Sequence, residues 1–124
     1  METFRIAIVG VCAAGKTTLA DGLRASGYDA VSVPQEHSNV RRLYRRVQPD
    51  FLVMLDARLD TVRRRRDVPW GQERLDEQLR RLAWARRECD LFLPTDDLSI
   101  EEVRERVIAA VKTSGRTAAA KEDT

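Results

Sequence analysis

GVCAAGKT, residues 10–17, is the most informative segment of this 124-residue chain. A mostly apolar run, residues 4–9, comes before it and is typical of a buried strand that ends at a glycine. After it, the apolar residues Leu19, Ala20 and Leu23 have the spacing of a helix. The stretch therefore predicts a strand, a glycine loop and a helix in direct succession.

The same stretch matches the pattern G-x-x-x-x-G-K-[ST] in the strand-to-helix setting that this phosphate-binding motif requires. Glycines let backbone N–H groups turn toward an anion, and the helix N-terminus adds partial positive charge. Lys16 would supply a point charge for the β- and γ-phosphates, and Thr17 would bind Mg²⁺. The alternative is a glycine-containing turn with a fortuitous lysine. The predicted nucleotide-binding residues here are Gly10, Val11, Cys12, Ala13, Ala14, Gly15, Lys16, Thr17 and Thr18.

Three further strands are predicted at Ala30–Pro34, Phe51–Asp56 and Asp90–Pro94. Strand patterns alternate with helical ones, which predicts a sheet covered by helices on both faces. The expected fold class is therefore a three-layer α/β/α domain with a short, mostly parallel sheet of about four strands. Glu36 and Asp56 follow strand ends, so we expect them near the glycine loop at the ligand-binding edge of the sheet.

Helices are predicted between these strands and after the last one. Ser38 is expected to begin a helix whose half-buried face is Val40, Leu43, Tyr44 and Val47. Other helices are expected over residues 58–66, over Gln72–Arg87, and from the capping box of Ser99 and Glu102. In the Gln72–Arg87 helix the predicted apolar side is Leu75, Leu79, Leu82 and Ala83.

Composition and charge favour one compact domain, expected over residues 1–113, with a disordered tail over 114–124. A formal net charge of +2 gives no global attraction to nucleic acid or membranes, so no nucleic-acid site is expected. Cys12 and Cys89 lack metal or disulfide spacing, and the sequence has neither a signal peptide nor an apolar run near the ~20 residues of a membrane span. We expect a reduced, cytoplasmic protein without a membrane partner.

Three segments carry a resemblance to a known group of proteins: GVCAAGKTTLA (10–20), PDFLVMLDARLDTVRRRR (49–66) and LPTDDLSIEEV (93–103). Over nearly all of residues 4–112 the chain resembles a small member of the P-loop kinase group, the superfamily of adenylate, shikimate, gluconate and nucleoside kinases. The resemblance implies a P-loop NTPase domain that binds ATP, or another nucleoside triphosphate, together with Mg²⁺.

The resemblance also implies catalytic cations. Lid arginines of such kinases close over the nucleotide and stabilise charge on the transferring phosphoryl group. From the run Arg63–Arg66 we select Arg64 and Arg66 as catalytic candidates beside Lys16. The alternative for any single arginine of this run is a solvated basic helix end. Another basic set, on the helix predicted from Ser38, is either solvated or faces an anionic acceptor: Arg41, Arg42, Arg45 and Arg46.

Four acidic or hydroxyl residues complete the predicted site. In the deoxynucleoside kinases of the group that the chain resembles, a glutamate at the place of Glu36 is the base that acts on the acceptor hydroxyl. The alternative is a first-turn acid that complements a helix dipole. Asp56 ends an apolar strand and could hold Mg²⁺ through water, although strand-end structure is the default interpretation. Thr95 and Asp96 match the family's loop on the nucleotide-base side.

The predicted function is transfer of the γ-phosphoryl group of Mg-ATP to a hydroxyl or phosphate of a small molecule, such as a nucleoside or nucleotide. Relatives usually carry a further strand and a substrate domain where this chain has only residues 34–50. Two alternatives therefore stay open. One is a nucleotide-sensing module without efficient chemistry, and the other is an NTPase in which Gln35 or Glu36 positions water.

Overall fold

The computed structural model describes residues 4–115. Its centre is a parallel sheet of four strands in the order β2-β1-β3-β4. The strands are β1 (Arg5–Gly10), β2 (Asp29–Ser32), β3 (Phe51–Asp56) and β4 (Leu91–Pro94). The predicted α/β class and four-stranded sheet are confirmed, and the sheet is parallel throughout.

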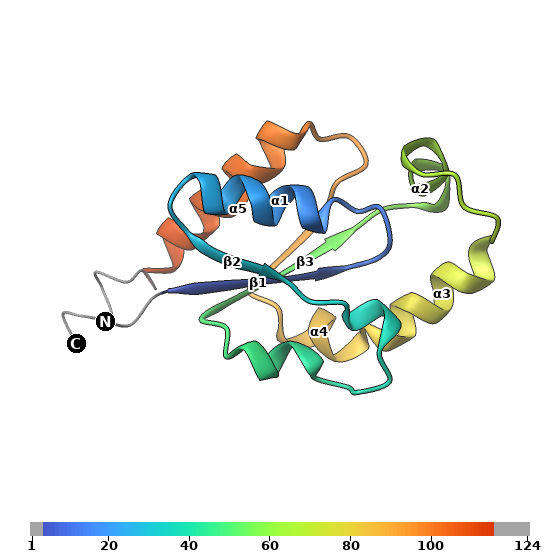
Figure 1. The fold of residues 1–124 in the computed structure, drawn as a ribbon, viewed down its shortest axis with the longest axis horizontal. Helices are drawn as coiled ribbons and strands as arrows, with labels where there is room; N and C mark the ends of the chain where they lie inside the picture. The colour runs from blue at the N-terminus through green and yellow to red at the C-terminus, as the bar shows by residue number, and fades with distance from the viewer. Residues whose placement is uncertain (1–3, 116–124) are drawn as a thin grey trace.

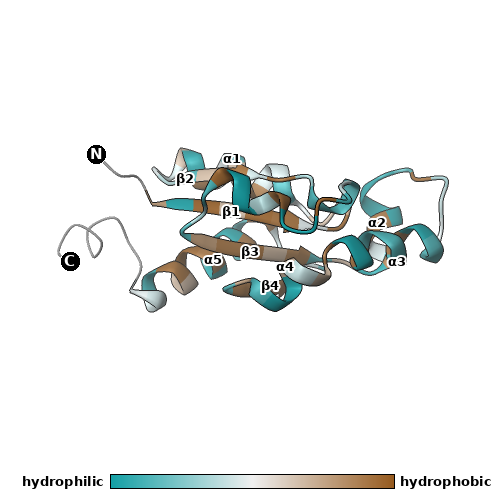
Figure 2. Cartoon of the chain, turned by 90° about the horizontal axis from the view of Figure 1, so that it is seen from below, coloured by the Kyte–Doolittle hydropathy of each residue, from teal (hydrophilic) through white to brown (hydrophobic). Residues whose placement is uncertain are grey.

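The two central strands form the middle of the core. Ile6 of β1 pairs with Phe51 of β3, and the register continues to Gly10 beside Leu55. Both strands are covered on both faces, as the near-continuous apolar sequence of a parallel strand requires. Figure 2 shows β1 and β3 as hydrophobic bands between more hydrophilic helices.

Helices flank the sheet on both faces (Figure 1). α1 (Lys16–Ala25) and α5 (Ile100–Ser114) pack together on one face. The opposite face carries α3 (Gln72–Arg81), α4 (Ala83–Glu88) and two short 3₁₀ helices, η1 (Gln35–His37) and η2 (Leu43–Val47). The remaining helix, α2 (Leu59–Arg65), follows β3. Among the helices of residues 4–115, none combines the length and the apolar composition that a membrane span needs.

The capping box that opens α5 is confirmed. The Ser99 hydroxyl accepts the Glu102 N–H at 3.1 Å, and the Glu102 carboxylate accepts the Ser99 N–H at 3.0 Å. α5 continues through Ser114 to Gly115, so the predicted tail begins inside the helix, and residues 116–124 lie outside the described part of the chain.

The helix predicted from Ser38 is wrong, because only the short helices η1 and η2 form there. Val40, assigned to a half-buried face, is 43% exposed, although Tyr44 is buried. The cause is the buried amide of Gln35, which donates to the Val40 carbonyl at 2.7 Å and accepts the Tyr44 N–H at 3.2 Å. The Ser38 hydroxyl also accepts the Val40 N–H at 3.0 Å, which favours a turn over a helix.

Two other predicted elements need correction. The helix over Gln72–Arg87 breaks at Leu82, which is completely buried and non-helical at ψ 1°. The break rotates the following turn, so Ala85 is buried and Ala83, predicted on the apolar side, is exposed. The second strand runs over Asp29–Ser32 instead of Ala30–Pro34, although the Val33 N–H still donates to β1.

The strand order brings the ends of β1 and β3 together. The chain leaves β1 toward β2 at one edge of the sheet, and then crosses back to place β3 on the other side of β1. In parallel sheets, ligands bind beyond the carboxyl ends of the strands where the order reverses in this way. The glycine loop, residues 10–15, lies at this place.

Candidate functional site

A cavity of about 810 Å³ opens beside the glycine loop. We call it the loop cavity. Its walls come from the glycine loop and the start of α1, from η1, from the end of α2 and from the segment between β4 and α5. The lining residues that carry polar chemistry are Lys16, Thr17, Thr18, Glu36, His37, Arg65, Arg66 and Thr95, with Cys12 and Ser32 at the wall.

The glycine loop needs glycine for steric reasons. Gly10 has φ +157°, and a Cβ there would lie 2.4 Å from the Leu55 carbonyl oxygen of β3. Ala13 and Gly15 have φ of 61° and 106°, the left-handed region, so the chain turns sharply before α1 begins. Successive N–H groups in such a backbone form a concave nest for an anion.

The N–H groups of this nest are free to bind a ligand. Within residues 4–115, those of Ala13 and residues 15–18 donate to no carbonyl or side chain, and Gly15 offers no side-chain cap. The first helical bond is from the Leu19 N–H to the Gly15 carbonyl at 2.9 Å. No acid neutralises the first turn of α1, so its partial positive charge faces the cavity.

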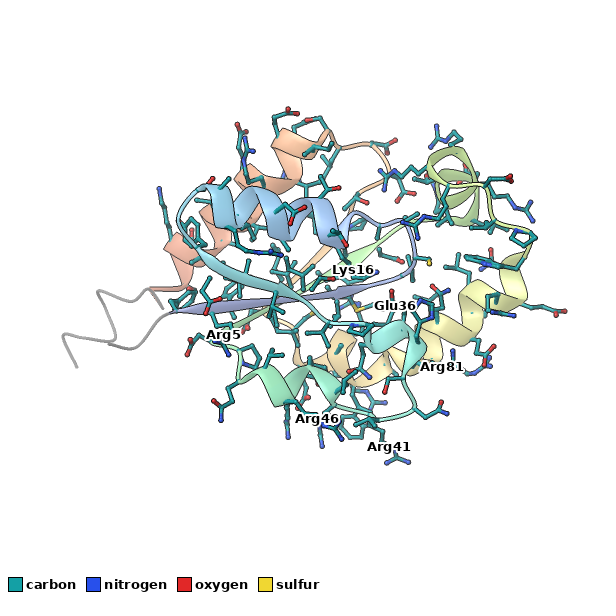
Figure 3. The ribbon with its side chains drawn as sticks, in the orientation of Figure 1. Arg5, Lys16, Glu36, Arg41, Arg46 and Arg81 are labelled. Carbon is teal, nitrogen blue, oxygen red and sulfur yellow. The ribbon has the colours of Figure 1, made fainter. Side chains whose placement is uncertain are left out.

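Lys16 and Glu36 form a buried ion pair on the floor of the cavity. The Lys16 Nζ lies 2.6 Å from Glu36 Oε2, with side-chain exposures of 11% and 4%. The same ammonium donates to the Gly10 and Val11 carbonyls at 3.1 Å each, so it closes the glycine loop from inside. Figure 3 shows the two side chains pointing toward one another from α1 and η1.

The second oxygen of Glu36 has no partner. Oε1 is buried and, among the described residues, is the one buried side-chain polar atom without a hydrogen bond. His37 approaches only Oε2, at 3.7 Å, and its own side chain is exposed. A buried carboxylate oxygen without a donor is costly, so this atom marks a place where a ligand donor would fit.

The four consecutive arginines at the end of α2 differ sharply in their contacts. Arg65, which the sequence analysis did not select, donates to the Ala13 carbonyl at 3.0 Å and to the hydroxyl and carbonyl of Thr95 at 2.9 and 2.6 Å. Arg66 lines the cavity with its guanidinium 3.7 Å from the Cys12 sulfur. Arg64 donates to Thr61 in its own helix and is not among the lining residues.

Thr95 and Asp96 lie on different sides of their loop. Thr95 is buried and lines the cavity, where its hydroxyl donates to the Ala14 carbonyl at 2.9 Å. Asp96 instead accepts the Arg58 N–H and the Thr61 hydroxyl at the start of α2. Burial opposes the ionisation of Asp96, but these hydrogen bonds outweigh it and lower its pKa. Thr95 therefore braces the glycine loop, and Asp96 holds α2.

Asp56 is half-buried at the end of β3 and is not among the residues that line the loop cavity. Burial raises the pKa of its carboxyl group, against a hydrogen bond from the Ala57 backbone. Within residues 4–115, no group of three or more His, Cys, Asp or Glu side chains is placed to hold a metal ion. The structure thus does not bring Asp56 and Thr17 together at one cavity wall.

Two buried glutamines shape the site, and the structural role of neither was predicted from the sequence. Gln78 of α3, 1% exposed, accepts the Cys12 N–H at 2.9 Å and so ties α3 to the glycine loop. The Gln35 side-chain amide donates to the Val40 and Arg81 carbonyls and accepts the Tyr44 N–H, so it is not free to position water. The role of Gln78 could have been predicted from its position, because it lies three residues after Leu75 on the apolar face of its helix.

No protein-family model and no curated protein matches this chain.

Proposed function

We propose that this protein is a P-loop phosphotransferase that binds a nucleoside triphosphate, such as ATP, in the loop cavity and passes its γ-phosphoryl group to a small-molecule acceptor. One observation carries the proposal. Five unbonded N–H groups, the Lys16 ammonium and the Glu36 carboxylate, with its unpartnered oxygen, belong to the wall of a single cavity. Anion donors and a candidate base are thus adjacent.

The phosphates would bind to the backbone nest and to Lys16. Unbonded N–H groups and the N-terminus of α1, a helix of 10 residues, favour anionic oxygens. Lys16 would exchange part of its contact with Glu36 for phosphate oxygens, which have the charge to compete. The volume of about 810 Å³ lies within the usual range for sites of nucleotide-sized ligands.

Glu36 would act on the acceptor. Its buried Oε1 would accept the hydrogen bond of an acceptor hydroxyl and take the proton as the acceptor oxygen bonds to the γ-phosphorus. The bond from that phosphorus to the bridging oxygen breaks, and the nucleoside diphosphate leaves. Where the acceptor is itself a phosphate, no proton needs to move, and Glu36 would serve only to orient it.

Arg66 is the arginine available to neutralise the transferring group. Arg65 already uses its guanidinium on Ala13 and Thr95, so it holds the glycine loop in shape. Among residues 4–115, the Arg66 side chain contacts only the Cys12 sulfur, and weakly, so it can turn into the cavity without breaking a strong bond. Of the two arginines selected from the sequence, Arg64 would therefore contribute little.

Mg²⁺ fits this site as a companion of the triphosphate. Mg²⁺ usually keeps several waters and is held by phosphates with one or two protein ligands. The Thr17 hydroxyl lines the cavity and would be such a ligand, with Asp56 a more distant candidate. When bound, the ion would neutralise charge on the phosphates.

The test measures Mg-ATP binding by calorimetry and acceptor-dependent ADP release on one sample, over a panel of nucleosides, nucleotides, sugars and hydroxy acids. Lys16→Ala should weaken binding by two orders of magnitude or more, and Glu36→Gln should abolish transfer while sparing binding. Lys112→Ala and Glu105→Gln, both at exposed positions of α5, are the matched controls.

The alternatives give different results in the same experiment. Binding that depends on Lys16 without acceptor-dependent turnover would identify a nucleotide-sensing module. ADP release that no acceptor stimulates would identify an NTPase. Absence of Mg-ATP binding in the unmodified protein would refute the proposal in every form.

A further inference from the structure

A second, separate cavity of about 570 Å³ lies on the other side of η1. We call it the basic cleft. It opens between the segment after η1 and the junction of α3 and α4, and it shares no residue with the loop cavity. Figure 3 shows Arg41 and Arg81 on this side of the sheet, away from Lys16. The lining residues are Ser38, Asn39, Arg41, Glu77, Arg80, Arg81, Ala83 and Trp84.

Only one of the three arginines in the basic cleft is neutralised. Arg81 donates to the Glu77 carboxylate at 2.8 Å and, more weakly, to Asn39 and the Glu36 carbonyl at 3.4 Å each. Among the described residues, the side chains of Arg41 and Arg80 have no hydrogen bond, ion pair or ring contact. The cleft therefore holds two uncompensated positive charges.

Nearby groups do not supply the missing negative charge. Glu88, on α4 beside the cleft, is bound by Arg42 at 3.0 Å, by Arg45 at 2.5 Å and by the hydroxyl of Tyr44. Arg42 also covers the Trp84 ring at 4.1 Å from its centroid. Arg42 and Arg45 thus have partners of their own, whereas Arg41 and Arg80, among the described residues, have no anionic partner.

We infer that the basic cleft binds a phosphomonoester group of a small molecule, at a site distinct from the loop cavity. A phosphomonoester carries a charge of roughly −1.5 to −2 at neutral pH, which matches the two free guanidinium groups. Guanidinium forks bind phosphate oxygens in pairs, with stronger hydrogen bonds than neutral donors make. Ser38 and Asn39 add neutral polar groups for the remainder of the ligand.

The structure favours a small ligand over a nucleic-acid backbone. Two unpaired arginines, Arg41 and Arg80, line one cleft together, whereas a strand would need a row of cations along the surface. Beside the cleft, Arg42 and Arg45 share the Glu88 carboxylate, and Arg42 and Arg87 lie over the Trp84 ring. Phosphomonoester binding in the basic cleft does not depend on nucleotide binding in the loop cavity, because the two cavities share no lining residue.

Trp84 provides a direct readout of binding. The chain has two tryptophans, so Trp70→Phe leaves Trp84 as the only one. In this background, titration with glycerol phosphate and with inorganic phosphate, at constant ionic strength, should change Trp84 fluorescence saturably in the millimolar range or below. Arg41→Ala/Arg80→Ala should weaken the apparent affinity about tenfold or more.

Matched variants separate a site from general charge. Arg46→Ala/Arg74→Ala removes the same charge at exposed positions outside the cleft and should change the affinity less than about twofold. Arg41→Lys/Arg80→Lys keeps the charge but loses the planar forks, and should give an intermediate loss. Circular dichroism of each variant checks that the fold is retained, and the lysine pair replaces the alanine pair if the latter unfolds.

Three results would overturn the inference: no saturable change with either phosphate probe, equal losses in the alanine pair and the Arg46/Arg74 control, or binding of single-stranded RNA through Arg41 and Arg80 without binding of glycerol phosphate. The Lys16-dependent binding of Mg-ATP is measured separately. Failure at one cavity therefore leaves the result at the other intact.

Discussion

The buried pair of Lys16 and Glu36 allows a sharp test by substitution. At 2.6 Å and an effective dielectric constant of 20, Coulomb's law gives an attraction of about 6 kcal/mol before desolvation is subtracted. Lys16→Met would leave the Glu36 carboxylate, 4% exposed, with His37 at 3.7 Å as its one charged neighbour in the described part of the chain. Removing one partner of a buried pair costs about 3–5 kcal/mol, so we expect a loss of that size in the free energy of unfolding.

Urea unfolding at pH 7 of the two single variants and the double variant measures the coupling. Glu36→Gln removes the charge but keeps the shape, and Lys16 retains the carbonyls of Gly10 and Val11. The double variant Lys16→Met/Glu36→Gln buries no unpaired charge. Its loss in the free energy of unfolding should therefore be smaller than the sum of the two single losses by about 2 kcal/mol or more.

The exposed pair of Asp21 and Arg24 in the same helix is the control. Its atoms lie 3.5 Å apart with side-chain exposures of 67% and 53%, so Asp21→Asn should cost less than about 1 kcal/mol. A loss below about 1 kcal/mol for Lys16→Met, or additive losses in the double variant, would refute the view that these two charges stabilise one another out of water.

Three further predictions concern the surroundings of the site. Gly10→Ala places a Cβ 2.4 Å from the Leu55 carbonyl oxygen, so urea unfolding should show a loss of about 3 kcal/mol or more. Gln78→Leu removes the acceptor of the Cys12 N–H bond, so the Mg-ATP affinity measured by calorimetry should fall about tenfold. Burial raises the pKa of the Asp56 carboxyl group above its ordinary 3.8, so the folded state binds the carboxyl proton more tightly than the unfolded state does. The folded state therefore loses stability as the pH rises from 3.8 through the raised pKa. Asp56→Asn should therefore raise the thermal midpoint at pH 7 and leave it nearly unchanged at pH 3.

Each of these predictions has a control in the same chain. Gly27 has φ +95° with open space around it, so Gly27→Ala should cost only about 1 kcal/mol of backbone strain. Gln72→Leu alters an exposed glutamine of α3 and should leave the Mg-ATP affinity unchanged; equal losses at Gln72 and Gln78 would contradict the loop contact. Asp97→Asn, at an exposed position, should not change the pH dependence of the midpoint, and a shift equal to that of Asp56→Asn would remove burial as the cause.

Local patterns were sufficient where the structure depends on neighbours in sequence. The strand, glycine loop and helix around GVCAAGKT follow from adjacent residues, and so do β3 and the capping box of Ser99 and Glu102. The pattern failed after Ser38, where the spacing of Val40 and Tyr44 fits a helix. There the buried Gln35 amide forms hydrogen bonds to the backbone in a non-helical conformation. The spacing of apolar residues gives no information about such competing hydrogen bonds.

The α/β class, the four strands and the loop with its lysine could be predicted from the sequence, because each depends on the period and turn chemistry of a short segment. Which residues meet could not be predicted in this way. Glu36 pairs with Lys16 from 20 residues away along the chain, Gln78 holds Cys12 from 66 residues away, and Arg65, not Arg64, reaches the glycine loop. These contacts depend on strand order and on the direction of single side chains, and long-range packing sets both.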